Sequence, residues 1–118
     1  MKKDITEEAD IRKLVYTFYD KVRADDLLGP IFNGIIQDRW DQHLQTMVSF
    51  WSTLLLYTRT YKDDPMPKHR KLPVTQVHFN RWLHLFNQTL ADHFEGPIAA
   101  NASKRAQSIA KIMLALKD

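Results

Sequence analysis

Four side chains that carry both a ring and a polar atom stand in or beside apolar stretches of the sequence: Tyr19, His43, His69 and Trp82. A purely structural helix would favour leucine or alanine at such positions. An imidazole nitrogen can bind a metal ion, and a phenol or an indole can donate a hydrogen bond to a ligand beside that metal. Residues of these types predict a pocket around a metal-containing cofactor, if the fold brings them together.

His69 has an apolar neighbour three residues to either side, Met66 and Leu72. An imidazole framed in this way suits an axial ligand of haem iron, and haem also carries two propionates that cations must neutralise. Basic side chains outnumber acidic ones around this histidine, and they are Arg59, Lys62, Lys68, Arg70 and Lys71. A solvated basic loop with a surface histidine is the alternative, and the segment taken alone favours it.

The other three ring side chains fall on predicted helices. His43 stands four residues before Met47, so both side chains point to one helical face. Tyr19 lies one residue off the apolar stripe of its helix, where a phenol can be buried if its hydroxyl finds a partner. The Trp82 side chain has a single hydrogen-bond donor, the indole N–H, on a large apolar ring system. In isolation an edge histidine and a core tryptophan are the plainer interpretations. The remaining histidines do not share one helical face and are interpreted as surface or rim residues: His78, His84 and His93.

A helical period in the apolar residues runs through most of the chain and predicts four main helices. The first begins behind Thr6 as its N-cap and ends near Leu28, and Gly29-Pro30 with Asn33-Gly34 then predict a corner. Three prolines between residues 57 and 74 permit at most one or two helical turns there. The other helices are expected at about 38–56, 75–93 and 98–116. No strand pattern is found, so residues 1–118 are predicted to form one all-α domain.

The composition predicts a single core with room for a flat apolar group. Apolar residues make up 44% of the chain and include six Phe, four Tyr and three Trp, a heavy aromatic load for a small domain. The absence of cysteine excludes disulfides and thiolate metal sites. The net charge is +3 with both signs mixed along the chain, which does not indicate nucleic-acid binding. No apolar run of membrane length and no signal-peptide pattern occurs, so we expect a soluble cytoplasmic protein without a membrane partner.

The sequence as a whole resembles the truncated haemoglobins, and specifically their group III, over nearly the full chain. Other truncated groups typically carry adjacent glycines at helix ends, whereas the three glycines here are all separate. The chain departs from the pattern at Asp64, where similar proteins tend to place a glycine before the proline, and at Pro67, close to His69. The landmarks that carry the resemblance are the segments 18–23 and 28–32, then Trp40, His43, Phe50-Trp51, His69, Leu72-Pro73 and the segment 78–83.

This resemblance implies a shortened globin fold in which two antiparallel helix pairs sandwich one haem b. His69 would be the proximal iron ligand, with Lys68, Arg70 and Leu72 beside it in contact with the cofactor. The matching distal positions are a phenol donor at Tyr19, an indole donor at Trp82, a histidine donor or gate at His43, a wedge against the porphyrin at Phe32 and a wall residue at Met47.

A pocket of this kind predicts chemistry on a bound ligand more than oxygen delivery. Each buried donor stabilises partial negative charge on dioxygen by about 1.5–3 kcal/mol, which slows release roughly 10- to 150-fold. The same donors would stabilise developing charge during attack on nitric oxide or cleavage of a peroxide. We therefore expect detoxification of nitric oxide or peroxide, with carbon monoxide as a further ligand. An external reductase is expected because the sequence has no flavin or nicotinamide motif.

Two other classes of function stay open at the level of sequence. A sensor or oxygen-binding module without turnover would use the same pocket, and the sequence does not separate it from an enzyme. A haem-free helical interaction domain, able to bind nucleic acid, would use the aromatic residues as plain core and His69 as a loop residue. The family landmarks argue against this second class.

Overall fold

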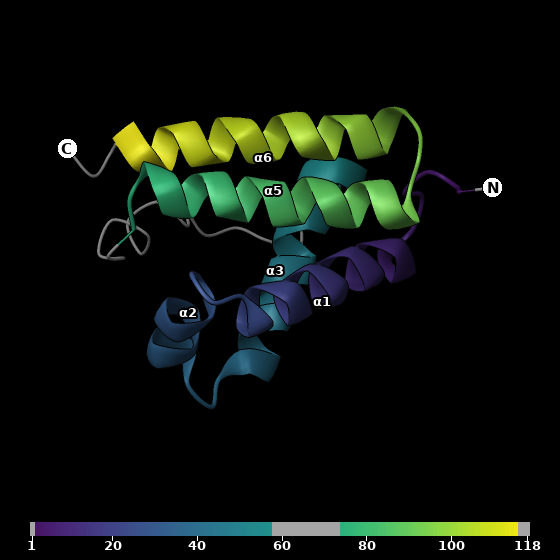
Figure 1. Cartoon of the computed structure of the whole chain (residues 1–118). Coiled ribbons are helices and arrows are strands. Elements are labelled where there is room, and N and C mark those ends of the chain that lie inside the picture. Colours follow the sequence, from purple (N-terminus) through teal and green to yellow (C-terminus); the bar gives the residue numbers. More distant parts are fainter. Residues whose placement is uncertain (1, 58–73, 116–118) are drawn as a thin grey trace.

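Five helices make up the described part of the chain in this computed structural model, which covers residues 2–57 and 74–115 (Figure 1). Their bounds are α1 (Glu8–Ala24), α2 (Gly29–Ile36), α3 (Trp40–Leu56), α5 (Gln76–His93) and α6 (Pro97–Ala115). His69 and its predicted neighbours Lys68, Arg70 and Leu72 lie outside the described residues. Within the described ranges, no helix has the length and apolar character needed to cross a membrane.

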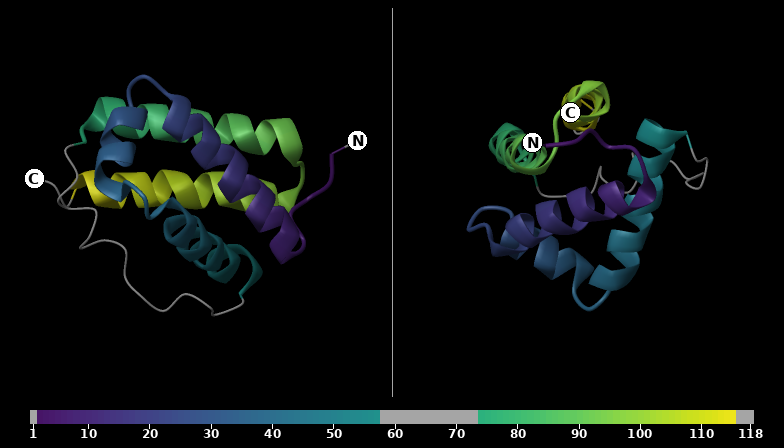
Figure 2. Two further views of the ribbon diagram at one scale, coloured as in Figure 1. Left: turned by 90° about the horizontal axis from the view of Figure 1, so that it is seen from below. Right: turned by 90° about the vertical axis from the view of Figure 1, so that its right-hand side faces the viewer.

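The helices are arranged as two pairs. α5 and α6 run side by side in opposite directions, and α1 crosses α3 on the other side of the molecule (Figures 1 and 2). α1 also packs against α5, and α2 lies against α1. This arrangement confirms the predicted all-α, two-over-two fold class.

The first helix begins one residue later than the predicted cap would place it. The carboxylate of Asp10 accepts hydrogen bonds from the backbone N–H of Thr6 (3.0 Å) and of Glu7 (3.2 Å), and Glu7 is the N-cap. A carboxylate in this position satisfies donors that the helix itself leaves unpaired. The apolar stripe predicted for this helix is buried throughout, at Ile11, Leu14, Val15, Phe18 and Val22.

The predicted corner after the first helix is wrong. α1 ends at Ala24 rather than near Leu28, and the supposed turn residues from Gly29 onward form α2. Pro30 stands in the first turn of α2, where its missing N–H removes no intrahelical bond. The Asp25 carboxylate accepts the N–H groups of Leu27 and Leu28 just before this helix. Glycine and proline here start a helix instead of closing a turn.

The remaining helices lie within two residues of their predicted bounds. α3 begins at Trp40, and α5 begins behind Thr75, whose backbone N–H donates to Nδ1 of His78 at 3.0 Å. In α6, Ile112 is 50% exposed. The buried stripe of α6 consists of small residues, which set how this helix is rotated about its axis: Ala99, Ala102, Ala106 and Ala110.

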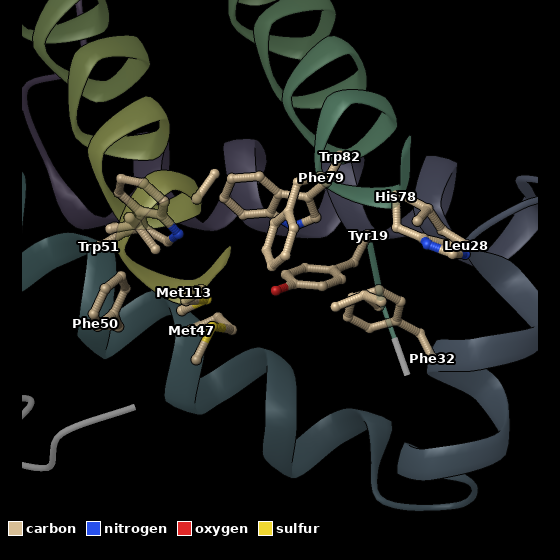
Figure 3. A pocket seen from close by; sticks show the side chains of 13 residues that line it. Tyr19, Leu28, Phe32, Met47, Phe50, Trp51, His78, Phe79, Trp82 and Met113 are labelled. Atoms are coloured by element: carbon tan, nitrogen blue, oxygen red, sulfur yellow. The ribbon is translucent and has the colours of Figure 1, made fainter. Parts of the chain in front are cut away.

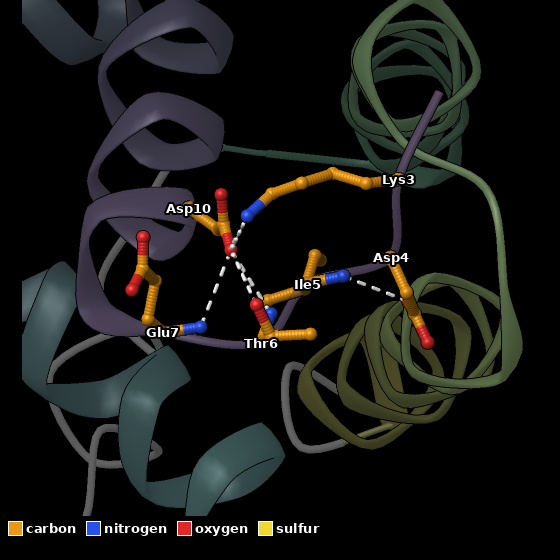
Figure 4. A network of polar contacts seen from close by, with 6 residues as sticks. All are labelled: Lys3, Asp4, Ile5, Thr6, Glu7 and Asp10. Atoms are coloured by element: carbon orange, nitrogen blue, oxygen red, sulfur yellow. Dashed lines mark hydrogen bonds and ion pairs between the residues drawn. The ribbon is translucent and has the colours of Figure 1, made fainter. Parts of the chain in front are cut away.

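Two carboxylates hold the segment before α1 in place: Asp4 joins it to the α5–α6 turn, and Asp10 joins it to α1 (Figure 4). Asp4 accepts the N–H groups of Ile98 (3.0 Å) and Ala99 (2.9 Å) in the first turn of α6. The backbone of Lys3 forms an isolated parallel β-bridge with Phe94. The Lys3 ammonium lies 3.1 Å from the Asp10 carboxylate. These contacts join the start of α1 to the α5–α6 turn.

Candidate functional site

A cavity lies between the two helix pairs, with walls from all five helices (Figure 3). The empty space in it, including the solvent at its open mouth, is about 690 Å³. Apolar and aromatic side chains form most of its surface. The residues that line it are Tyr19, Leu28, Phe32, Met47, Phe50, Trp51, Val74, His78, Phe79, Trp82, Ile109, Ala110 and Met113.

Tyr19 places the most distinctive polar group in this apolar space. Its side chain is only 5% exposed, and its ring packs edge-on against Phe18 at 4.9 Å between centroids. The hydroxyl points into the cavity (Figure 3) and has no hydrogen-bond partner among the described residues. Burial raises the pKa of Tyr19 above its ordinary value of 10.0, because the phenolate would be poorly solvated. The hydroxyl therefore keeps its proton and remains a donor.

Trp82 lines the same cavity from α5, as the sequence predicted. Its ring stacks on Phe86 (5.6 Å, 9° between planes) and meets the edge of Phe18 at 5.5 Å. The same Phe86 also stacks on Trp51 of α3 at 4.9 Å. These ring contacts fix the indole plane, and its N–H has no hydrogen-bond partner within the described residues. The fold thus brings two donors, Tyr19 and Trp82, to one cavity.

His43 lies behind this wall rather than in it. It is half-buried on α3 and does not line the cavity. Its ring meets Tyr19 edge-on at 5.1 Å and Trp40 at 5.7 Å between centroids. Trp40 in turn donates from Nε1 to Oδ1 of Asn33 at 3.1 Å and carries the Arg23 guanidinium over its ring. His43 is therefore positioned to support Tyr19, one ring away from the cavity.

The two other predicted contacts of the cofactor, Phe32 on α2 and Met47 on α3, both line the cavity. His78, predicted to be a surface or rim residue, is half-buried and lines the cavity while its Nδ1 accepts from Thr75. Several further lining residues lie on predicted helices but were not predicted as site residues, and these are Trp51, Phe79, Ile109 and Met113. Helical period identifies the inward face of a helix, but not which part of that face meets another helix.

The lining suits an occupant that is mainly apolar and is held by few polar groups. The described residues contain no group of three His, Cys, Asp or Glu side chains that could hold a metal ion by themselves. A metal here would therefore need a carrier such as a porphyrin, with one side-chain ligand from elsewhere in the chain. Val74, which is 6% exposed, lines the cavity five residues after His69 in the sequence.

Comparison with known proteins gives three findings. A family model described as bacterial-like globin matches residues 3–116. A group 3 truncated haemoglobin of Campylobacter jejuni is 37% identical over 114 residues, covering 93% of this chain and 90% of the relative. The crystal structure of a group III truncated haemoglobin from Campylobacter jejuni superposes with a TM-score of 0.91 at 34% identity, covering all of this chain and 96% of the other.

Proposed function

This chain belongs to the bacterial-like globin family and, within it, to the group III truncated haemoglobins, and from this premise we propose that it detoxifies nitric oxide or peroxide at a haem b. As a truncated haemoglobin it is a haem globin that binds small diatomic ligands. The proposal has three parts. The haem is haem b, residues 1–118 form one haem-binding domain, and the reaction is detoxification of nitric oxide or peroxide.

One observation carries the proposal: the Tyr19 hydroxyl points into an apolar cavity and has no partner among the described residues. The hydroxyl faces the open space of the cavity. A ligand there that accepts a hydrogen bond could pair with it, whereas a phenylalanine at this position would offer no donor. This supports a ligand-binding role for Tyr19.

The proposed cofactor would lie between the walls that carry Phe32 and Met47, with His69 as the ligand of its iron. Val74 follows His69 by five positions, and such a stretch reaches at most about 18 Å. The chain can therefore bring this imidazole to the cavity that Val74 lines. Lys68 and Arg70 would pair with the propionates, and Leu72 would add apolar contact.

When bound, haem would supply an iron centre that takes diatomic ligands and exchanges electrons. The chain's own contribution is a pair of positioned donors in an apolar space. Tyr19 holds its proton because burial raises its pKa, and both Tyr19 and Trp82 can donate to a ligand that carries partial negative charge. His43 would orient the phenol ring or enter the cavity as a gate.

Two donors would hold dioxygen too tightly for efficient delivery, since each stabilises it by about 1.5–3 kcal/mol. The same hydrogen bonds would lower the barrier for attack on nitric oxide or for cleavage of a peroxide. Oxidised haem would then need an electron, which we assign to an external reductase because the sequence carries no dinucleotide fingerprint.

The test is to load the protein with haem, reduce it, expose it to oxygen and then mix it rapidly with nitric oxide. We expect a stable oxygenated spectrum that converts to the ferric form with one nitrate for each protein oxidised. A His69→Ala variant should lose the histidine-ligated spectrum. Oxygen binding without nitrate formation or peroxide turnover would favour a sensor or storage protein, and failure to take up haem would overturn the proposal.

A further inference from the structure

We infer that Asp25 and Arg81 act as positioning residues for the cavity, because their ion pair holds the α1–α2 corner against α5. Asp25 is 8% exposed and uses both carboxylate oxygens. Oδ2 accepts the backbone N–H groups of Leu27 (3.0 Å) and Leu28 (2.9 Å), and Oδ1 accepts Nη1 of Arg81 at 2.9 Å. One carboxylate therefore joins two elements that are 56 residues apart in the chain.

The corner on one side of this ion pair carries two lining residues of the cavity. Leu28 is 1% exposed, and its carbonyl accepts the N–H of Phe32 at 3.0 Å. Both side chains line the cavity (Figure 3). Gly29 lies so close to the end of α1 that a Cβ there would stand 2.7 Å from the carbonyl oxygen of Arg23. The corner is thus closely packed within itself, and Asp25 gives it a polar attachment to α5, next to the packing of Phe18 against Trp82.

Arg81, the other partner of the ion pair, lies on α5 between two residues that line the cavity. Arg81 directly precedes the distal donor Trp82 and lies three residues after His78, and both of these neighbours line the cavity. A shift of α5 at Arg81 would therefore move the indole relative to Tyr19. The ion pair sets the separation of two cavity walls without itself entering the cavity.

A second ion pair between α1 and α5 provides a matched control. Lys21 of α1 lies 3.3 Å from Asp92 of α5, with side chains 26% and 56% exposed. Neither residue lines the cavity. If ion pairs on this side of α5 served stability alone, loss of either one should have the same consequences for the cavity.

Breaking the Asp25–Arg81 pair should change the rate of ligand release only a little. It should change the geometry of the cavity more clearly. Arg81 is 47% exposed, so solvent screens the interaction. We expect carbon monoxide to leave the protein about two- to fivefold faster, the range that a partly exposed ion pair allows. The clearer effect should be that the cavity adopts a wider range of conformations than in the wild type.

The experiment compares the infrared stretching band of bound carbon monoxide, which responds to the nearby donors, in five variants. Arg81→Met and Asp25→Asn should each broaden the band or add a second one. The double variant should differ little from either single variant, and Arg81→Lys should restore part of the wild-type band. Lys21→Met should leave the band unchanged. This readout rests on the proposed function, because it needs bound haem.

A second readout needs no cofactor. In the haem-free protein, backbone hydrogen exchange over residues 27–32 should be faster in Arg81→Met than in Lys21→Met. Unchanged exchange and an unchanged band in Arg81→Met would overturn the inference, as would equal changes in Lys21→Met. If the wild-type chain takes up no haem, the proposed function fails while hydrogen exchange still decides the role of this ion pair.

Discussion

At the N-terminal segment, the carboxylate of Asp4 accepts three backbone hydrogen bonds, from Ile5, Ile98 and Ala99. Tyr19 is more deeply buried as a residue, but its hydroxyl points into the cavity and has no hydrogen bond within the described residues. The carboxylate of Asp4 joins two segments of the fold and is saturated by protein partners, since leaving it unpaired would cost stability. The Tyr19 hydroxyl faces a cavity, where it is available to a ligand. The two regions thus separate polar residues used for structure from those used for binding.

The largest difference between the two regions is expected in ligand binding, when the two cavity donors are replaced. Tyr19→Phe should accelerate dioxygen dissociation roughly 10- to 150-fold, because a charge-assisted hydrogen bond is lost. Adding Trp82→Phe should accelerate it further, while thermal stability changes little. Flash photolysis or stopped-flow measurement of the oxygen off-rate tests this, with Tyr16→Phe on the exposed side of α1 as control. Unchanged off-rates in both variants would remove the distal donors from the proposal.

Gly96→Ala should produce the largest change in stability at the N-terminal segment. Gly96 has φ = +143°, and a Cβ there would stand 2.5 Å from Cγ of Asp4. Strained backbone of this kind costs about 1–3 kcal/mol. Chemical denaturation should show this loss for Gly96→Ala. Gly34→Ala is the control, since a Cβ at Gly34 meets nothing within 4 Å and alanine is the better helix former. Equal stability of the two variants would contradict the close approach of Asp4 to the α5–α6 turn.

Asp4→Ala should cost somewhat less, about 0.5–2 kcal/mol, the range found for loss of a helix-capping side chain. The reason is that Ile98 and Ala99 would lose their acceptor in the first turn of α6. Oxygen off-rates should stay at the wild-type value, because Asp4 does not line the cavity. The free energy of unfolding and the off-rate are measured on the same variant, with Asp20→Ala on exposed α1 surface as control. A changed off-rate would show that the two regions are coupled.

The smallest effect is a pH dependence of stability that originates in the N-terminal segment. Desolvation alone would raise the pKa of Asp4, but hydrogen bonds from Ile98, Ala99 and Ile5 outweigh it and lower the pKa below 3.8. The pKa of Asp10 is lowered in the same way: its burial acts upward, and its bonds to Thr6, Lys3 and Glu7 act more strongly downward. A depressed pKa adds stability above the unfolded value, and this is lost as pH falls through the folded value.

Stability should therefore decline as pH falls below about 4, and Asp4→Ala should decline less steeply than the wild type over that interval. Denaturation midpoints between pH 7 and pH 3 measure this. Identical slopes for both proteins would assign the acid sensitivity to other carboxylates.

Much of the fold followed from local patterns. The period of Ile11, Leu14, Phe18 and Val22 is enough to identify α1, because burial of one face is a property of the helix itself. Gly29 and Pro30 led to the wrong prediction of a corner after the first helix, since the same two residues can end one helix or start the next. The choice depended on Asp25, whose carboxylate accepts the N–H groups of Leu27 and Leu28 before α2.

The sequence by itself determined the helical class, the inward faces and, through its family landmarks, the identity of Tyr19 and Trp82 as residues of one site. Only the tertiary structure decided that the Tyr19 hydroxyl is left without a described partner, that His43 stands behind the cavity wall, and that Asp25 reaches Arg81. Helix periodicity depends on neighbours three or four residues apart. The cavity and the two donors that line it depend on residues from the five described helices, whose separation no local pattern specifies.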